Sequence, residues 1–153
     1  MCTSSRRAGE PGSGPVFKLF VVAHGARESI EILEVDTRPA TPEATWLGCV
    51  VAPDPIGLNS VRGLPDGGFI TTNFLPRGST REATQRMLGG EQNGELWEWH
   101  TTSGWVKVPG SEAAGANGLD RLRELGADAQ TPAPLRDTAL TAVKRIERWG
   151  LLT

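Results

Sequence analysis

The feature that most constrains the fold is a succession of short apolar runs between residues 16 and 109, each ended by residues that form turns. Each run is rich in β-branched and aromatic residues and shows the period-2 alternation of a β-strand. The runs cover residues 17–23, 29–35, 45–51, 68–73, 95–100 and 104–108. Because many short strands follow one another with almost no helix between them, we expect an antiparallel all-β architecture.

The connections between these runs carry turn and cap signals. Residues 24–28 form a loop short enough for an antiparallel hairpin. Asp66 and Gly67 predict a second hairpin, because glycine readily takes the positive φ that such turns need. Residues 79–88 predict a short surface helix, with Ser79 or Thr80 as its cap.

The run 95–100 holds two of the tryptophans. Alternation places Trp97 and Trp99 on one face and Leu96 and Glu98 on the other. The indoles could form an aromatic shelf for a ligand, but we interpret them as core residues, because each can bury an area worth a few kcal/mol at about 25 cal/mol per Å². His100 matches no motif and is interpreted as a surface or packing residue.

The two ends of the chain differ from this β-rich middle. Residues 1–15 are rich in glycine, serine, proline and arginine, which bury too little area to offset their ordering entropy, so we expect a disordered tail. Residues 119–126 and 135–149 predict helices, and the second has one apolar face: Leu135, Ala139, Ala142, Val143, Ile146 and Trp149. We therefore expect a tail over 1–15, a β domain over 16–119 and a helical or aberrant segment over 120–153.

Composition excludes several kinds of partner. Lys and Arg number 16 against 18 Asp and Glu, so there is no basic surplus and we expect no nucleic acid partner. No segment approaches the roughly 20 apolar residues that span a bilayer, so we expect no membrane. The residues as written predict a cytoplasmic protein; a start codon further upstream would leave room for an export signal. Cys2 and Cys49 are too few for a disulfide framework or a zinc site.

Three stretches in order carry a family resemblance. They are residues 19–25 followed by 29–32, then 58–73, and then 108–110 leading to 116–119. Together they resemble the gluconolactonase, paraoxonase (arylesterase) and strictosidine synthase-like group of six-bladed β-propellers, over about residues 16–119. The resemblance implies a partial β-propeller of about two to three blades of antiparallel strands.

The resemblance also implies a calcium ion, held in the central channel by oxygens from inner strands of different blades. Asn59 and Asn117 match two of the family's ligand asparagines, and their amide oxygens suit a hard cation. Each could instead bond its own backbone in a turn. His24 matches a histidine that paraoxonase-like members use in acid/base chemistry, where it would take a proton from an attacking water. The alternative for His24 is a loop histidine that bonds locally.

The chain departs from the family pattern in three ways. Ser60 stands where paraoxonase-like members have an aspartate for a second calcium, so we do not expect that second ion. An acidic ligand from an N-terminal blade and a later Asp or Asn are missing, so we expect low calcium affinity. Residues 120–125 begin a helical, arginine-rich stretch where the family continues with strands, and we expect residues 120–153 to come from a frameshift, a fusion or a truncated gene.

The resemblance implies metal-assisted hydrolysis of a small-molecule lactone or ester, which truncation could abolish. The alternative hypothesis is a non-catalytic binding or scaffold fragment that needs a partner to complete the propeller. Two or three blades cannot close a ring, and open strand edges invite self-association. A metal-independent, strictosidine synthase-like enzyme ranks last, because it needs a catalytic acid from regions that the sequence lacks.

Overall fold

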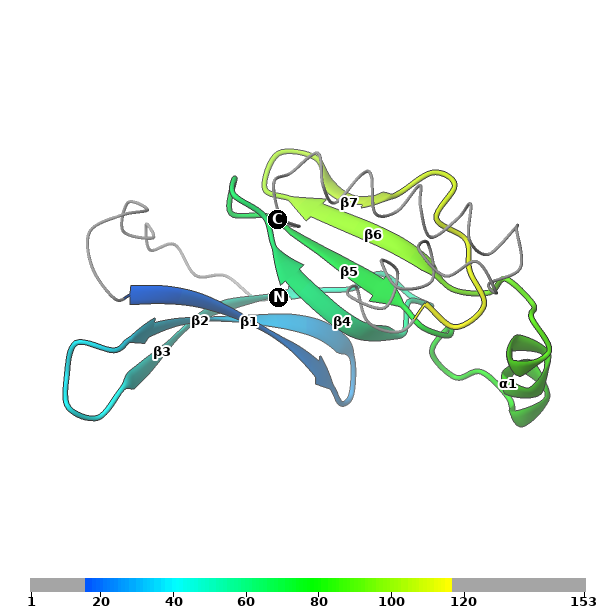
Figure 1. Cartoon of the computed structure of the whole chain (residues 1–153), viewed down its shortest axis with the longest axis horizontal. Helices are drawn as coiled ribbons and strands as arrows, with labels where there is room; N and C mark the ends of the chain where they lie inside the picture. Colours follow the sequence, from blue (N-terminus) through cyan, green and yellow to red (C-terminus); the bar gives the residue numbers. More distant parts are fainter. Residues whose placement is uncertain (1–15, 117–153) are drawn as a thin grey trace, which may run out of the picture. The chain divides into compact units, whose positions relative to one another are not determined.

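The computed structural model describes residues 16–116, and the chain divides into two compact units, Met1–Ala52 and Pro53–Thr153. The described residues are mostly β-strands in two antiparallel sheets, with one short helix (Figure 1). This confirms the predicted all-β class. The predicted tail 1–15 and segment 120–153 lie outside the described residues.

The first unit is a three-stranded antiparallel meander of long strands. Its strands are β1 (Val16–His24), β2 (Glu28–Asp36) and β3 (Glu43–Val51), in the order β1-β2-β3. The β1–β2 ladder runs without a break from Val16 opposite Asp36 to His24 opposite Glu28. The β2–β3 ladder shifts register between Ile32 and Leu33, where β3 carries a bulge.

Few side chains of the first sheet are fully enclosed. Ile30 is completely buried and Cys49 is 8% exposed. Large apolar side chains on β1 and β3, by contrast, remain exposed.

The second unit contains a four-stranded antiparallel meander. Its strands are β4 (Leu58–Gly63), β5 (Phe69–Asn73), β6 (Glu95–His100) and β7 (Gly104–Lys107), in the order β4-β5-β6-β7. All five residues of β5 are buried. Because successive side chains of a strand point to opposite faces, both faces of this central strand are covered.

The core of the second unit combines aromatic and aliphatic packing. The Phe69 ring stacks on Trp99 at 5.4 Å between centroids, with 13° between the ring planes. The Phe69 ring also meets the Trp105 ring edge to face, at 5.3 Å between centroids. Phe69 therefore joins β5 to both β6 and β7. The largest fully buried side chains of this unit are Phe69, Ile70, Leu96, Val108, Thr71 and Thr72.

The short helix α1 (Arg81–Leu88) lies between β5 and β6, and confirms the helix predicted over 79–88. Thr80 is its N-cap: the Thr80 hydroxyl accepts a hydrogen bond from the backbone N–H of Ala83 at 3.3 Å. Met87 is the buried residue of the helix, whereas Leu88 is 78% exposed.

Two predictions need correction. β4 was not predicted, because its sequence Leu-Asn-Ser-Val-Arg-Gly holds few β-formers; pairing with the buried strand β5 makes it a strand. The predicted alternation on β6 is present, but Leu96 and Glu98 form the more deeply buried face, and Trp97 and Trp99 are only half-buried.

Candidate functional site

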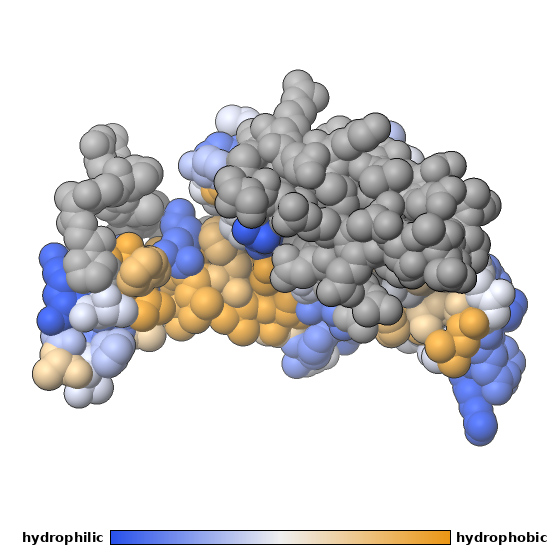
Figure 2. Space-filling view, viewed as in Figure 1, coloured by the Kyte–Doolittle hydropathy of each residue, from blue (hydrophilic) through white to orange (hydrophobic). Residues whose placement is uncertain are grey.

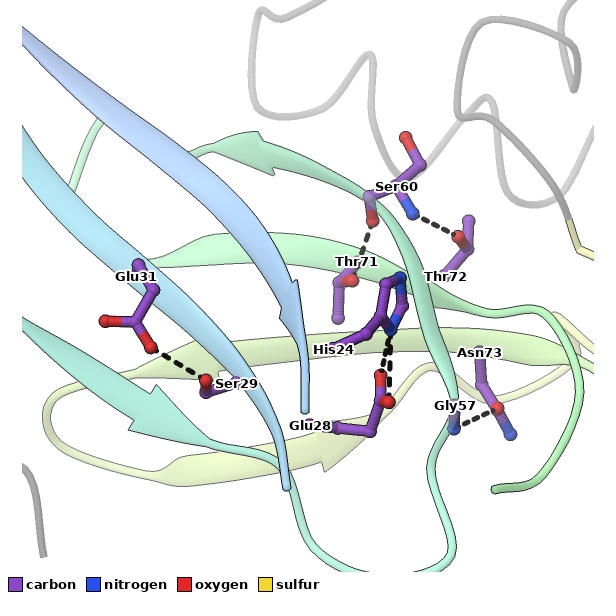
Figure 3. Close-up of polar contacts among 9 residues, drawn as sticks. All are labelled: His24, Glu28, Ser29, Glu31, Gly57, Ser60, Thr71, Thr72 and Asn73. Carbon is purple, nitrogen blue, oxygen red and sulfur yellow. Dashed lines mark hydrogen bonds and ion pairs between the residues drawn. The ribbon is translucent and has the colours of Figure 1, made fainter. Parts of the chain in front are cut away.

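His24, the predicted acid/base residue, ends β1 and pairs across the hairpin with Glu28, the first residue of β2. It therefore belongs to a strand, not to the loop. Its Nδ1 lies 2.9 Å from Oε2 and 3.1 Å from Oε1 of Glu28 (Figure 3). The histidine side chain is 62% exposed and the glutamate side chain 11%.

This pair has the form of a histidine oriented by a carboxylate. A carboxylate that accepts a hydrogen bond from Nδ1 favours the tautomer that carries its proton there, which leaves the Nε2 lone pair to accept another proton. The backbone of Glu28 is fixed, because the N–H of Ala52 donates to the main-chain carbonyl oxygen of Glu28 at 3.0 Å. The local bonding that was the alternative for His24 is thus present, and it is compatible with a role as a base.

Asn59, the first predicted calcium ligand, lies in a β-bulge of β4. Leu58 pairs with Asn73 and Val61 with Thr71, so both Asn59 and Ser60 stand opposite Thr72. The Asn59 side chain is exposed.

Two threonine hydroxyls fix the backbone of this bulge. The N–H of Ser60 donates to Thr72 Oγ1 at 3.0 Å, and Thr71 Oγ1 donates to the Ser60 carbonyl at 2.7 Å (Figure 3). Both threonines are fully buried. The bulge therefore presents the Asn59 amide from a fixed backbone.

Of the two predicted calcium ligands, the described residues contain Asn59. Calcium takes six to eight oxygen ligands, and Asn59 offers one amide oxygen. Within residues 16–116 no group of three or more His, Cys, Asp or Glu is placed to hold a metal ion. The second predicted ligand, Asn117, lies outside the described residues.

Asn73, which also belongs to the stretch that carries the resemblance, has a structural role. Its Oδ1 accepts from the N–H of Gly57 at 2.8 Å and its Nδ2 donates to Glu95 Oε1 at 2.8 Å (Figure 3 shows the first contact). The same Glu95 oxygen accepts from the indole N–H of Trp97 at 2.7 Å. The polar group of Trp97 is thus used within the sheet, which favours the packing interpretation over a ligand shelf.

A lysine continues this network on β7. Lys107 Nζ lies 2.9 Å from Glu112 Oε1 and 4.0 Å from Glu95 Oε2. The hydrogen bond to Glu112 raises the pKa of Lys107, and the charges of Glu95 and Glu112 add to this effect against partial desolvation. The same bond lowers the pKa of Glu112.

His100 has partners that sequence reasoning missed. Its Nδ1 lies 2.6 Å from Asp66 Oδ2 and its Nε2 lies 3.5 Å from Glu98 Oε2. The His100 side chain is 15% exposed and that of Glu98 is 5%. With a carboxylate at each ring nitrogen, His100 is less suited than His24 to serve as a base, and it fastens the turn before β5 to the end of β6.

Two further observations support a structural role for His100. Burial of Asp66 opposes ionisation, but hydrogen bonds from the Gly68 N–H and from His100 outweigh it, so the pKa of Asp66 lies below its usual range. A Cβ on Gly68 would lie 2.9 Å from His100 Nδ1 and 2.4 Å from the Trp99 carbonyl oxygen. A glycine is therefore needed at position 68 to make room for this contact.

Helices of the described residues are too short and too polar for any of them to cross a membrane. Comparison of the chain with family models, with curated proteins and with solved structures finds no match in any of the three.

Proposed function

We propose that this chain belongs to the lineage of the propeller hydrolases it resembles and that it opens lactones or esters with His24 as general base. The observation that carries the proposal is the exposed His24 ring, oriented by both carboxylate oxygens of Glu28. A positioned base of this kind typically contributes about 10²–10⁴-fold to a hydrolytic rate.

The fold of the second unit supports the propeller part of this proposal. A four-stranded antiparallel sheet is the usual blade of a β-propeller, and β4 to β7 form such a sheet in sequence order. Asn59 lies on β4, which is an edge strand of that sheet. The strand of a blade that lines the central channel is also an edge strand of its sheet, so this position suits a ligand of a channel calcium. Asn59 and Asn117 are the proposed calcium ligands, because their amide oxygens suit a hard cation.

The proposed reaction balances with water as the second substrate. His24 Nε2 takes a proton from water as the water oxygen bonds to the carbonyl carbon. The bond between that carbon and the ester oxygen then breaks, and the departing alkoxide receives the proton. A lactone gives a hydroxy acid, and an ester gives an acid and an alcohol. Glu28 stabilises the imidazolium while the proton is on the ring.

The test is turnover of an aryl ester and of small lactones by the full chain, with calcium and with a chelator. His24→Asn should lower turnover by about 100-fold or more, and Glu28→Gln by about tenfold with a changed pH profile. Glu43→Gln is the matched control, because this exposed glutamate lies on β3 of the same sheet. Turnover no higher than in buffer, or full activity of His24→Asn, would refute the proposed activity.

A calcium titration tests the metal part separately. Calcium should raise the melting temperature of the wild-type chain, and Asn59→Ala should reduce this rise because it removes one oxygen ligand. Equal stabilisation of the two proteins would remove Asn59 from the proposed site.

The second candidate function is a non-catalytic module that assembles with a partner. The outer strands β1, β3, β4 and β7 favour it, because outer strands are where sheets add further strands. Light scattering coupled to size exclusion distinguishes the candidates: a stable complex or oligomer without turnover supports assembly, and a monomer that hydrolyses lactones supports catalysis.

A further inference from the structure

One face of the first sheet is apolar and exposed. Paired residues of an antiparallel ladder point to the same face, so the rows Phe17–Val35–Ala44 and Leu19–Leu33–Trp46 cross all three strands on one side. Val21 extends this side along β1. Figure 2 shows hydrophobic side chains gathered over the first sheet. We call these residues, namely Phe17, Leu19, Val21, Leu33, Val35, Ala44 and Trp46, the apolar face of the first sheet.

Four large side chains of this face are well exposed. Phe17 is 59% exposed, Trp46 53%, Leu19 46% and Val21 40%. Single exposed apolar residues are ordinary, but a contiguous apolar patch on a folded unit usually marks an interaction surface. Because the four side chains lie on adjacent rows of one sheet, they form such a patch.

The charge pattern of this face indicates what could cover it. The charged side chain among its strand residues is Glu31, opposite Val21. Its Oε2 accepts from the Trp46 indole N–H at 2.8 Å and its Oε1 from the Ser29 hydroxyl at 2.8 Å. Both carboxylate oxygens thus have donors within the sheet, and burial of the face would not strip them of hydrogen bonds. At the end of the same face, the Arg27 guanidinium donates to Cys49 Sγ at 3.3 Å, and Cys49 pairs with Glu31. One carboxylate and one guanidinium balance, so the face does not select a partner of one charge.

We propose that a second copy of this chain packs its first sheet against this apolar face, across a two-fold axis. A two-fold contact places the same patch on both sides, so the patch must be complementary to itself. An apolar surface whose charged groups, Glu31 and Arg27, both have partners within the first sheet meets that condition. At the exposed fractions above, the four side chains present roughly 400–500 Å² per copy, since a large aromatic side chain offers about 150–250 Å².

Two copies would therefore remove about 1,000 Å² from water once the half-buried Leu33 and Val35 are included. This area reaches the roughly 1,000 Å² expected of a biological contact but stays below the roughly 1,200 Å² of a stable interface. The expected dimer is accordingly weak. It buries the face of the sheet rather than extending its edge, and it does not depend on the proposed hydrolysis.

The test is the molar mass of the full chain by sedimentation over a concentration series. We expect a reversible dimer that Leu19→Glu weakens by at least about tenfold, because it places a carboxylate at the centre of the contact. The matched control is Leu88→Glu on α1: Leu88 is more exposed, at 78%, but lies outside the apolar face, so the control should dimerise as the wild type does.

Circular dichroism establishes that each variant keeps its fold. If Leu19→Glu does not fold, Phe17→Ser at the edge of the patch replaces it. Hydrogen exchange adds a second readout, since residues 16–24 and 43–51 should gain protection as concentration rises. A monomer at every concentration, or a dimer equally affected by the Leu88 control, overturns the proposal.

Discussion

The two sheets of this chain are built alike as antiparallel meanders, yet they differ in where their apolar side chains go. In the second sheet, every residue of the central strand β5 is buried. In the first sheet, the central strand β2 has two buried residues, Ser29 and Ile30, and the remainder are half-buried. Among the largest fully buried side chains of the described residues, Ile30 alone belongs to the first unit.

The difference shows that strand formation and core formation are separate requirements. The strands of the first sheet are longer, at nine residues each, and their ladders are more extensive. Within the first unit, however, the large side chains of its apolar face are left exposed, as Phe17 and Trp46 show. The second sheet gains its stability from packing, whereas the first relies more on its backbone hydrogen bonds and requires another surface to bury its side chains.

The largest expected difference between the two sheets comes from removing one phenylalanine from each. Phe69→Ala leaves a cavity between Trp99 and Trp105 and should cost about 3–5 kcal/mol of unfolding free energy. Phe17→Ala removes a ring that is 59% exposed and should cost under about 1 kcal/mol. Urea unfolding followed by circular dichroism, at a concentration where the chain is monomeric, measures both. Equal losses would contradict the comparison.

Glycine positions offer a second contrast. A Cβ on Gly57 would lie 2.0 Å from the Leu75 carbonyl oxygen, so Gly57→Ala must displace backbone and should cost about 1–3 kcal/mol or more. A Cβ on Gly25, in the β1–β2 hairpin, meets nothing within 4 Å, and Gly25→Ala should change stability by no more than about 0.5 kcal/mol. Thermal unfolding of the two variants side by side checks this order, and a larger loss for Gly25→Ala would reverse it.

Hydroxyl removal tests the bulge in β4. Thr71→Val keeps the shape of the side chain but deletes the hydrogen bond to the Ser60 carbonyl, which should cost about 1 kcal/mol. Thr45→Val on β3 is the matched control, because Thr45 is exposed and its replacement should be nearly neutral. Denaturant midpoints report the difference. If the two variants were equally stable, the threonine would not be holding the bulge.

The smallest expected effect is on how the free energy of unfolding depends on pH. The pKa of Asp66 is lowered in the folded chain, so its contribution to stability is present above the unfolded value near pH 4 and is lost as the pH falls through the lower folded value. Asp66→Asn should therefore lose stability relative to wild type at neutral pH, by under about 1 kcal/mol because the side chain is 42% exposed, and this difference should vanish in acid.

Asp36 provides the contrast from the first sheet. Side-chain and backbone hydrogen bonds from Arg38 lower its pKa to about 2. Because Arg38 is only two residues away, the same contact can form in the unfolded chain, and Asp36→Asn should leave the pH dependence of unfolding unchanged. Unfolding curves between pH 2 and pH 7 compare the two variants. An acid response that is larger for Asp36→Asn would contradict this expectation.

The strands that the sequence predicts are those with strong local signals. The runs around β1, β2, β3, β5, β6 and β7 are rich in β-branched and aromatic residues, and the cap at Thr80 marks α1. β4 lacks such a signal, because its strand character comes from its neighbour β5 and from two threonine hydroxyls. The β-propensity of a residue reflects its own conformational preference, so it cannot predict a strand that forms because of its partner strand.

The contacts of the two histidines also differ in whether local sequence can predict them. The His24–Glu28 contact follows from hairpin register, so a sequence that places the two residues at the ends of one short loop is enough to predict it. The contact between His100 and Asp66 joins residues 34 apart and depends on the β5–β6 register. No local pattern encodes that register, which is why His100 was interpreted as a surface or packing residue.

The connection from β5 to β6, which contains α1, has a practical consequence for protein engineering. Backbone hydrogen bonds fix both ends of this connection. At its start, the Phe74 N–H donates to the Gly57 carbonyl at 3.0 Å, and at its end Gly94 and Ala113 exchange two hydrogen bonds at 2.9 and 2.8 Å. Between these anchors, Gly89 and Gly90 are exposed. An inserted fluorescent reporter or affinity tag at this tip would have its linkers held close together without disturbing either sheet.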